Sequence, residues 1–157
     1  MSSCVPDITF EDVQVGDRFT TAVRQVTEQD VVEFARLSGD YHPEHMDEEY
    51  GRRSIHGGRI AHGVLILAMA TGLVNETGLF ETTTIAVLQI TVRFVKAARF
   101  GDTITTVATI NGKRVTSKPD RGIVTLGITV FNQNSIPLLE GEWLVMVSLS
   151  TRKILSL

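Results

Sequence analysis

The stretch IAHGVLILAMATGLV, residues 60–74, most constrains what this chain can fold into. Its apolar run is interrupted only by His62, Gly63, Thr71 and Gly72. A helix that is apolar nearly all round must be covered on nearly all sides. The most apolar part, residues 64–70, is far shorter than the roughly 20 residues that span a bilayer. We therefore expect a helix buried inside a folded domain, and no membrane span.

The rest of the chain supplies material to cover this helix. Runs rich in β-branched and aromatic residues predict an early strand and four long later strands. These are residues 17–26, 84–96, 102–115, 122–132 and 140–151. Asn111-Gly112 is interpreted as a bulge or bend, because a hairpin turn there would leave two short pieces. The order of elements predicts an α+β fold, in which one antiparallel sheet curls around a central helix, as a single domain over residues 1–157.

A short amphipathic helix is predicted just after the first strand. Thr27 and Asp30 stand at capping-box spacing, and Gly39 is a typical helix end. The following stretch GDYHPEH, residues 39–45, concentrates titratable groups. Because Pro43 denies His42 a helical conformation, we expect these seven residues to form a rigid loop.

Charge and cysteine content exclude some classes of function. The net charge is −3, and the basic residues are scattered, so a nucleic-acid-binding surface is not expected. The single cysteine, Cys4, can form no internal disulfide, and the N-terminus lacks the pattern of a signal peptide. We expect a cytoplasmic protein.

The span FARLSGDYHPEHMDEEYGRRSIHGGRIAHGVL, residues 34–65, resembles the hydratase motif of the MaoC-like, (R)-specific enoyl-CoA hydratase family. Similarity continues in FEDVQVGDRF (10–19) and VRFVKAARFGDTI (92–104). Two positions depart from the pattern: family members commonly carry asparagine at His42 and proline at Ala97. The resemblance implies a hot-dog fold, a homodimer and reversible hydration of a trans-2-enoyl thioester.

The same resemblance implies roles for particular residues. Asp40 and His45 would hold one water between them, add its oxygen to the β-carbon and return its proton to the α-carbon on the same face. The enolate oxygen needs N–H donors, which the first turn of a buried helix supplies. Gly63 fits this oxyanion hole because it has no side chain to block the thioester. His62 and His42 are assigned supporting roles.

Each assignment has a structural alternative. Asp40 could merely bind local backbone N–H groups in an Asx-type turn, and His45 alone could be an ordinary surface histidine. A neutral His62 near a helix N-terminus is at least as compatible with a structural bond as with substrate contact. His42 and His45 have H-x-x-H spacing, but no other ligand pair stands nearby, so no metal is expected. His56 receives no role.

The resemblance implies no separate cofactor, because coenzyme A or phosphopantetheine of an acyl carrier protein arrives as part of the substrate. Five basic residues are available for its phosphates, none singled out: Arg93, Lys96, Arg99, Lys113 and Arg114. Two other functions stay open. A thioesterase would release free thiol, and a non-catalytic thioester-binding module would bind without turnover.

Overall fold

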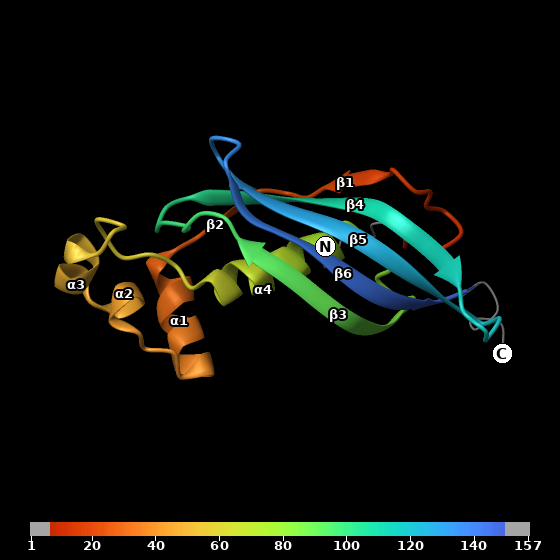
Figure 1. The fold of residues 1–157 in the computed structure, drawn as a ribbon, viewed down its shortest axis with the longest axis horizontal. Coiled ribbons are helices and arrows are strands. Elements are labelled where there is room, and N and C mark those ends of the chain that lie inside the picture. The colour runs from red at the N-terminus through yellow and green to blue at the C-terminus, as the bar shows by residue number, and fades with distance from the viewer. Residues whose placement is uncertain (1–6, 150–157) are drawn as a thin grey trace, which may run out of the picture.

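A single antiparallel sheet curls over one long helix in the computed structural model, which describes residues 7–149; Cys4 lies outside them. The strands run in the order β1-β4-β5-β6-β3, and β2 also pairs with β4. Their bounds are β1 (Arg18–Thr20), β2 (Arg24–Gln25), β3 (Thr84–Phe94), β4 (Thr103–Val115), β5 (Arg121–Asn132) and β6 (Pro137–Ser148). The helices are α1 (Glu28–Ser38), α2 (Pro43–Met46), α3 (Glu48–Arg53) and α4 (Gly63–Asn75). Figure 1 shows α4 beneath the sheet and α1 to α3 grouped at one end of the molecule.

The core lies between the sheet and one face of α4. Leu65, Ile66, Met69 and Leu73 of α4 are buried, and alternate residues of β4 and β5 face them with the period of two expected of strands. None of the helices in residues 7–149 is long and apolar enough to cross a membrane.

The expectation that α4 is covered on nearly all sides is wrong for the isolated chain. Val64, Ala68, Thr71 and Gly72 form an exposed stripe along it. The sheet curls around only one side of the helix, so the other side faces outward. Exposed apolar side chains continue onto the neighbouring edge strand β3: Ile85, Val87, Leu88, Ile90 and Phe94.

The four long strands are confirmed, although β6 begins at Pro137, three residues earlier than predicted, and residues 150–151 of that prediction lie outside the described residues. The interruption at Asn111-Gly112 is also confirmed. The pairing of β4 with β5 shifts register between Ile110 and Gly112, as a bulge requires. The predicted single strand over residues 17–26 is wrong. Thr20 pairs with Val107 and Arg24 with Ile104, so one extra residue lies in this segment, and it breaks the strand into β1 and β2.

The ends of α1 lie where the capping signals place them. The Thr27 side chain and Asp30 form a capping box, and Gly39 closes the helix in the left-handed conformation with φ 79°. The loop predicted after it is only partly correct. Residues 43–46 form α2, since proline is favourable in the first turn of a helix, and α3 follows within a segment for which no helix was predicted.

Candidate active site

Asp40 stands directly after the glycine that ends α1. Its Oδ1 accepts a hydrogen bond from the His42 backbone N–H at 3.2 Å. This bond forms the Asx-type turn that was the alternative to a catalytic role for Asp40, so Asp40 does stabilise its own loop. A carboxylate has two oxygens. One oxygen can hold the turn while the other accepts a hydrogen bond from a substrate or water.

His45 lies on α2 and is fixed by a backbone carbonyl. Its Nδ1 is 2.9 Å from the Ile60 carbonyl oxygen. Because a carbonyl oxygen can only accept, Nδ1 carries a proton, and in the neutral tautomer with that proton Nε2 is an acceptor. Arg59, which the sequence did not single out, donates from Nε to the His45 carbonyl at 2.7 Å and forms an ion pair with Glu28 of α1. These bonds fix α2 against neighbouring segments.

His42 holds the start of α2. Its ψ of 134° lies outside the helical region, as the following proline predicts, and its Nδ1 accepts from the Glu44 N–H at 3.3 Å. The His42 and His45 rings meet edge to face with centroids 6.0 Å apart. His42 therefore supports the loop as a helix cap, a role that asparagine also performs.

His62 is buried, with 2% of its surface exposed, and its ring contacts both Asp40 and His45. Its Nε2 is 2.9 Å from the Asp40 backbone carbonyl oxygen and therefore carries the proton. Its ring centroid lies 3.8 Å from that of His45 and 4.9 Å from that of Phe34. Its Nδ1 is buried without a hydrogen-bond partner among the described residues.

Burial lowers the pKa of His62 below its ordinary value of 6.5, because the charged ring loses solvation. The nearby His45 acts in the same direction, whereas the backbone bond to Asp40 and the Asp40 charge oppose it. The folded protein thus keeps His62 neutral at pH values where an exposed histidine is already protonated.

We predict that the stability of the fold falls with pH below about 6.5 partly through His62. In that pH range the unfolded chain binds a proton at His62 more readily than the folded chain does, which lowers the free energy of unfolding. This loss of stability vanishes at pH values above the unfolded-state pKa. One such group changes the free energy of unfolding by at most about 1.4 kcal/mol per pH unit. Urea unfolding of wild type and His62→Phe between pH 8 and 5 measures it. The variant should lose less stability on acidification, and equal slopes would contradict the prediction.

Gly63 is the first residue of α4, as predicted for the oxyanion hole. The preceding His62 has an extended backbone and makes no side-chain capping bond, so the first-turn N–H groups keep their donor capacity and the positive end of the helix dipole. The space beside Gly63 is occupied by Phe94 at the end of β3: an added Cβ would lie 2.8 Å from two of its ring carbons. Phe94 was not predicted from the sequence.

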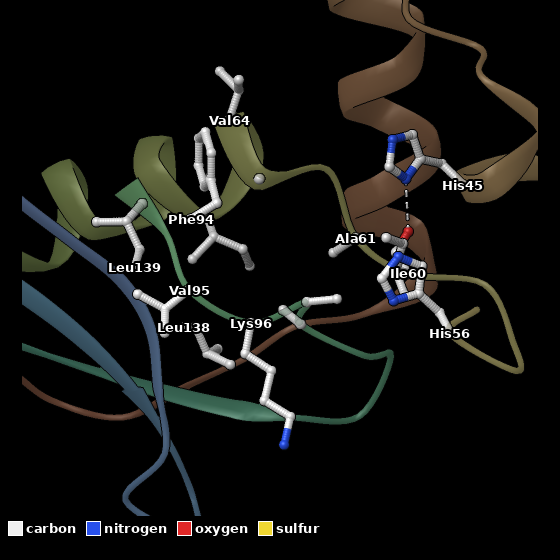
Figure 2. A pocket seen from close by; sticks show the side chains of 14 residues that line it. His45, His56, Ile60, Ala61, Val64, Phe94, Val95, Lys96, Leu138 and Leu139 are labelled. Atoms are coloured by element: carbon white, nitrogen blue, oxygen red, sulfur yellow. Dashed lines mark hydrogen bonds between the residues drawn. The ribbon is translucent and has the colours of Figure 1, made fainter. Parts of the chain in front are cut away.

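A pocket of about 370 Å³ connects these elements. Figure 2 shows His45 on one side, above its bond to Ile60, and the apolar side chains of Val64, Phe94 and Leu139 on the other. Gly63 also lines this pocket, and Asp40 does not. The walls are largely aliphatic, so the pocket suits an apolar group whose reacting atoms lie near His45 and Gly63.

Two polar side chains join His45 in the lining of this pocket. His56, which received no role from sequence, lies 3.6 Å from the Glu44 carboxylate. Lys96 is exposed and is the only one of the five basic residues considered for phosphate binding that lines this pocket. Arg93 pairs with Glu140, Arg99 donates to the His56 carbonyl, and Lys113 donates to the Phe10 and Val13 carbonyls.

Asp40, His45 and His62 bring potential metal-ligand atoms within 4.8 Å of one another. However, imidazole lone pairs lie in the ring plane, and the His45 and His62 rings are stacked with only 33° between their planes. A centroid separation of 3.8 Å places the faces of the two rings, rather than their nitrogen lone pairs, toward each other. We predict that neither chelator nor Zn²⁺ shifts the melting temperature. A zinc-dependent rise that His62→Phe abolishes would contradict this expectation.

The fold, an antiparallel sheet curled over one long helix, agrees with the protein family that the sequence matches. Residues 12–132 match the family described as the MaoC like domain. The chain belongs to the MaoC-like dehydratase family. Among solved structures, a monoamine oxidase regulatory protein from Archaeoglobus fulgidus is 32% identical, with a TM-score of 0.85 over 91% of this chain and 95% of that one. A 20% identical Mycobacterium tuberculosis protein with a double hot-dog fold, TM-score 0.81, covers 91% of this chain and 44% of its own and supports the fold alone. The hot-dog fold expected from the resemblance is confirmed.

Curated relatives of this MaoC-like chain include a named hydratase. The (R)-specific enoyl-CoA hydratase of Rhodospirillum rubrum is 33% identical over 88% of this chain and 90% of its own length. Protein MaoC of Klebsiella aerogenes is 37% identical over 68% of this chain, but the match spans only 31% of that longer protein. The MaoC-like assignment therefore applies to the matched part of this chain and carries nothing over from the rest of the longer Klebsiella protein.

Proposed function

We propose that this MaoC-like chain is an (R)-specific hydratase that reversibly adds water to trans-2-enoyl thioesters. The observation that carries the proposal is the convergence of His45, whose Nδ1 is held by the Ile60 carbonyl, and the first turn of α4 on one apolar pocket, with Asp40 adjacent. The activity for which the Rhodospirillum rubrum relative is named supports the same reaction.

The reaction divides among three groups in this proposal. The Asp40 carboxylate and His45 Nε2 hold a water and take one of its protons while its oxygen bonds to C3. The C2–C3 π electrons move onto the thioester oxygen, where the N–H groups at Gly63 stabilise the enolate. The Asp40–His45 pair then returns the proton to C2 on the same face, so one water supplies both added groups and the pair ends as it began.

The same proposal includes the group that carries the acyl thioester and the assembly of the chain into a homodimer. Lys96 at the pocket would meet a phosphate of coenzyme A or of a carrier protein's phosphopantetheine arm. A second copy would cover the apolar edge strand β3 and the exposed stripe of α4, because such edges are usually paired or protected. With a single cysteine, the proposed location is a reducing cytoplasm.

Hydration of crotonyl-CoA in D₂O tests the proposed chemistry. Because one face delivers both groups, the product should carry one deuterium at C2, syn to the new oxygen, and the R configuration at C3. NMR of the isolated product reads both centres. An S product or anti addition would overturn the proposed arrangement of Asp40, His45 and Gly63.

A further inference from the structure

His62 lowers the stability of the fold in a way that an apolar residue at the same position would not. The ring is 2% exposed, and its Nδ1 has no hydrogen-bond partner among the described residues. A buried, unpaired polar atom destabilises a fold, because no hydrogen bond replaces the hydration that it loses. A phenylalanine would fill similar space beside Phe34 without that cost. The polar ring therefore calls for an explanation beyond core packing.

The contacts of His62 supply one. Its Nε2–H donates to the backbone carbonyl of Asp40 at 2.9 Å, and its face lies against His45 with ring centroids 3.8 Å apart. The same residue directly precedes Gly63 and is the N-cap of α4. From the start of α4, whose first residue Gly63 lines the pocket, one side chain thus touches both the loop that carries Asp40 and the ring of His45.

We propose that His62 is a positioning residue that sets Asp40 and His45 relative to each other and to the first turn of α4. The inference rests on the proposed hydratase function. The hydrogen bond fixes where the Asp40 loop leaves α1, and the stacked ring restricts the rotation of His45 about its bond to Ile60. Misplacing reacting groups by about 1 Å costs on the order of 10²-fold in rate, so these contacts act on turnover rather than on binding.

Two variants separate the two contacts. His62→Phe keeps an aromatic face against His45 and Phe34 but loses the donor to Asp40. His62→Gln keeps an N–H donor for the Asp40 carbonyl but loses the ring. We expect kcat for crotonyl-CoA to fall roughly 10-fold or more in each variant, with KM changed by less than about 3-fold. His62→Phe should nevertheless melt at or above the wild-type temperature at pH 7.5, because it removes the unpaired buried nitrogen. Wild-type kcat in both variants would overturn the inference.

A measurement independent of turnover keeps this inference distinct from the proposed function. Long-range ¹H–¹⁵N NMR of the imidazoles reports the tautomer of each ring. In the wild type, His45 should be protonated only on Nδ1 and His62 only on Nε2. In His62→Gln, His45 should become a mixture of tautomers as its ring loses its support. An inactive wild type with this NMR result would reject the hydratase and keep the positioning role. A mixed His45 tautomer in the wild type, or a pure one in His62→Gln, would reject the positioning role itself.

Discussion

Replacing Asp40 by asparagine should lower kcat for an enoyl thioester by about 10³-fold and leave the fold intact. Asparagine keeps the oxygen that accepts the His42 N–H and so preserves the turn after α1. What it loses is the negative charge that, in the proposed mechanism, helps to take a proton from water. His45→Asn is the matching variant on α2. Its amide can still donate to the Ile60 carbonyl, as His45 Nδ1 does, but nothing replaces Nε2 as the base.

Both variants should show normal circular dichroism and melting temperatures near that of the wild type, so the loss can be assigned to chemistry. Asp120→Asn is the control for a lost carboxylate. Asp120 is exposed in the β4–β5 turn, at the opposite end of the sheet from α1 to α3, and its removal should leave kcat unchanged. If either Asp40→Asn or His45→Asn retained the wild-type rate, the assignment of the catalytic pair would be wrong.

Replacing Gly63 by alanine should lower kcat by about 10²-fold, the effect expected when an oxyanion donor is lost. In the proposed mechanism, the added methyl group would occupy the approach of the thioester oxygen to the first-turn N–H groups of α4. It would also lie 2.8 Å from the ring of Phe94, which must then move. Steady-state kinetics on the same enoyl thioester measures the loss.

Two further variants isolate the cause. Gly112→Ala adds the same methyl group on β4, outside the pocket and outside the surfaces assigned to the second copy, where an added Cβ meets only the Thr125 side chain at 3.7–3.8 Å; activity should be unchanged. In a Phe94→Ala background, Gly63→Ala no longer forces a ring aside. A full loss of rate there would support blocked access to the N–H groups, whereas recovery to the rate of Phe94→Ala alone would reject the oxyanion role.

Local signals in the sequence predicted the parts of the site that depend on local rules. Thr27, Asp30 and Gly39 bound α1 where capping preferences place its ends, and this delivers Asp40 just beyond the helix. The alternating burial of β4 and β5 follows the pattern of their residues. Gly63 opens α4 as expected, although the apolar run begins three residues earlier, because a helix begins where the backbone turns rather than where hydrophobicity rises.

Contacts between distant segments were beyond what the sequence could predict. His45 is fixed by Ile60, and Phe94 reaches Gly63 from the far end of a strand; neither residue carries a signal of its own. Arg59 resembles an ordinary surface arginine until its bond to the His45 carbonyl is seen. The exposed stripe of α4 also contradicts the simple rule that an apolar helix is covered, since the sheet covers only one side of it.

The most direct test is to mix the purified protein with crotonyl-CoA and follow the enoyl-thioester absorbance and free thiol together. The proposed hydratase should remove the absorbance and release no thiol, because water adds to C3 and the thioester bond stays intact. Thiol released in step with substrate loss would contradict this account and favour a thioesterase that uses the same pocket. Binding without any change in absorbance or thiol, across enoyl chains of several lengths on both coenzyme A and carrier protein, would contradict it in favour of a non-catalytic thioester-binding module.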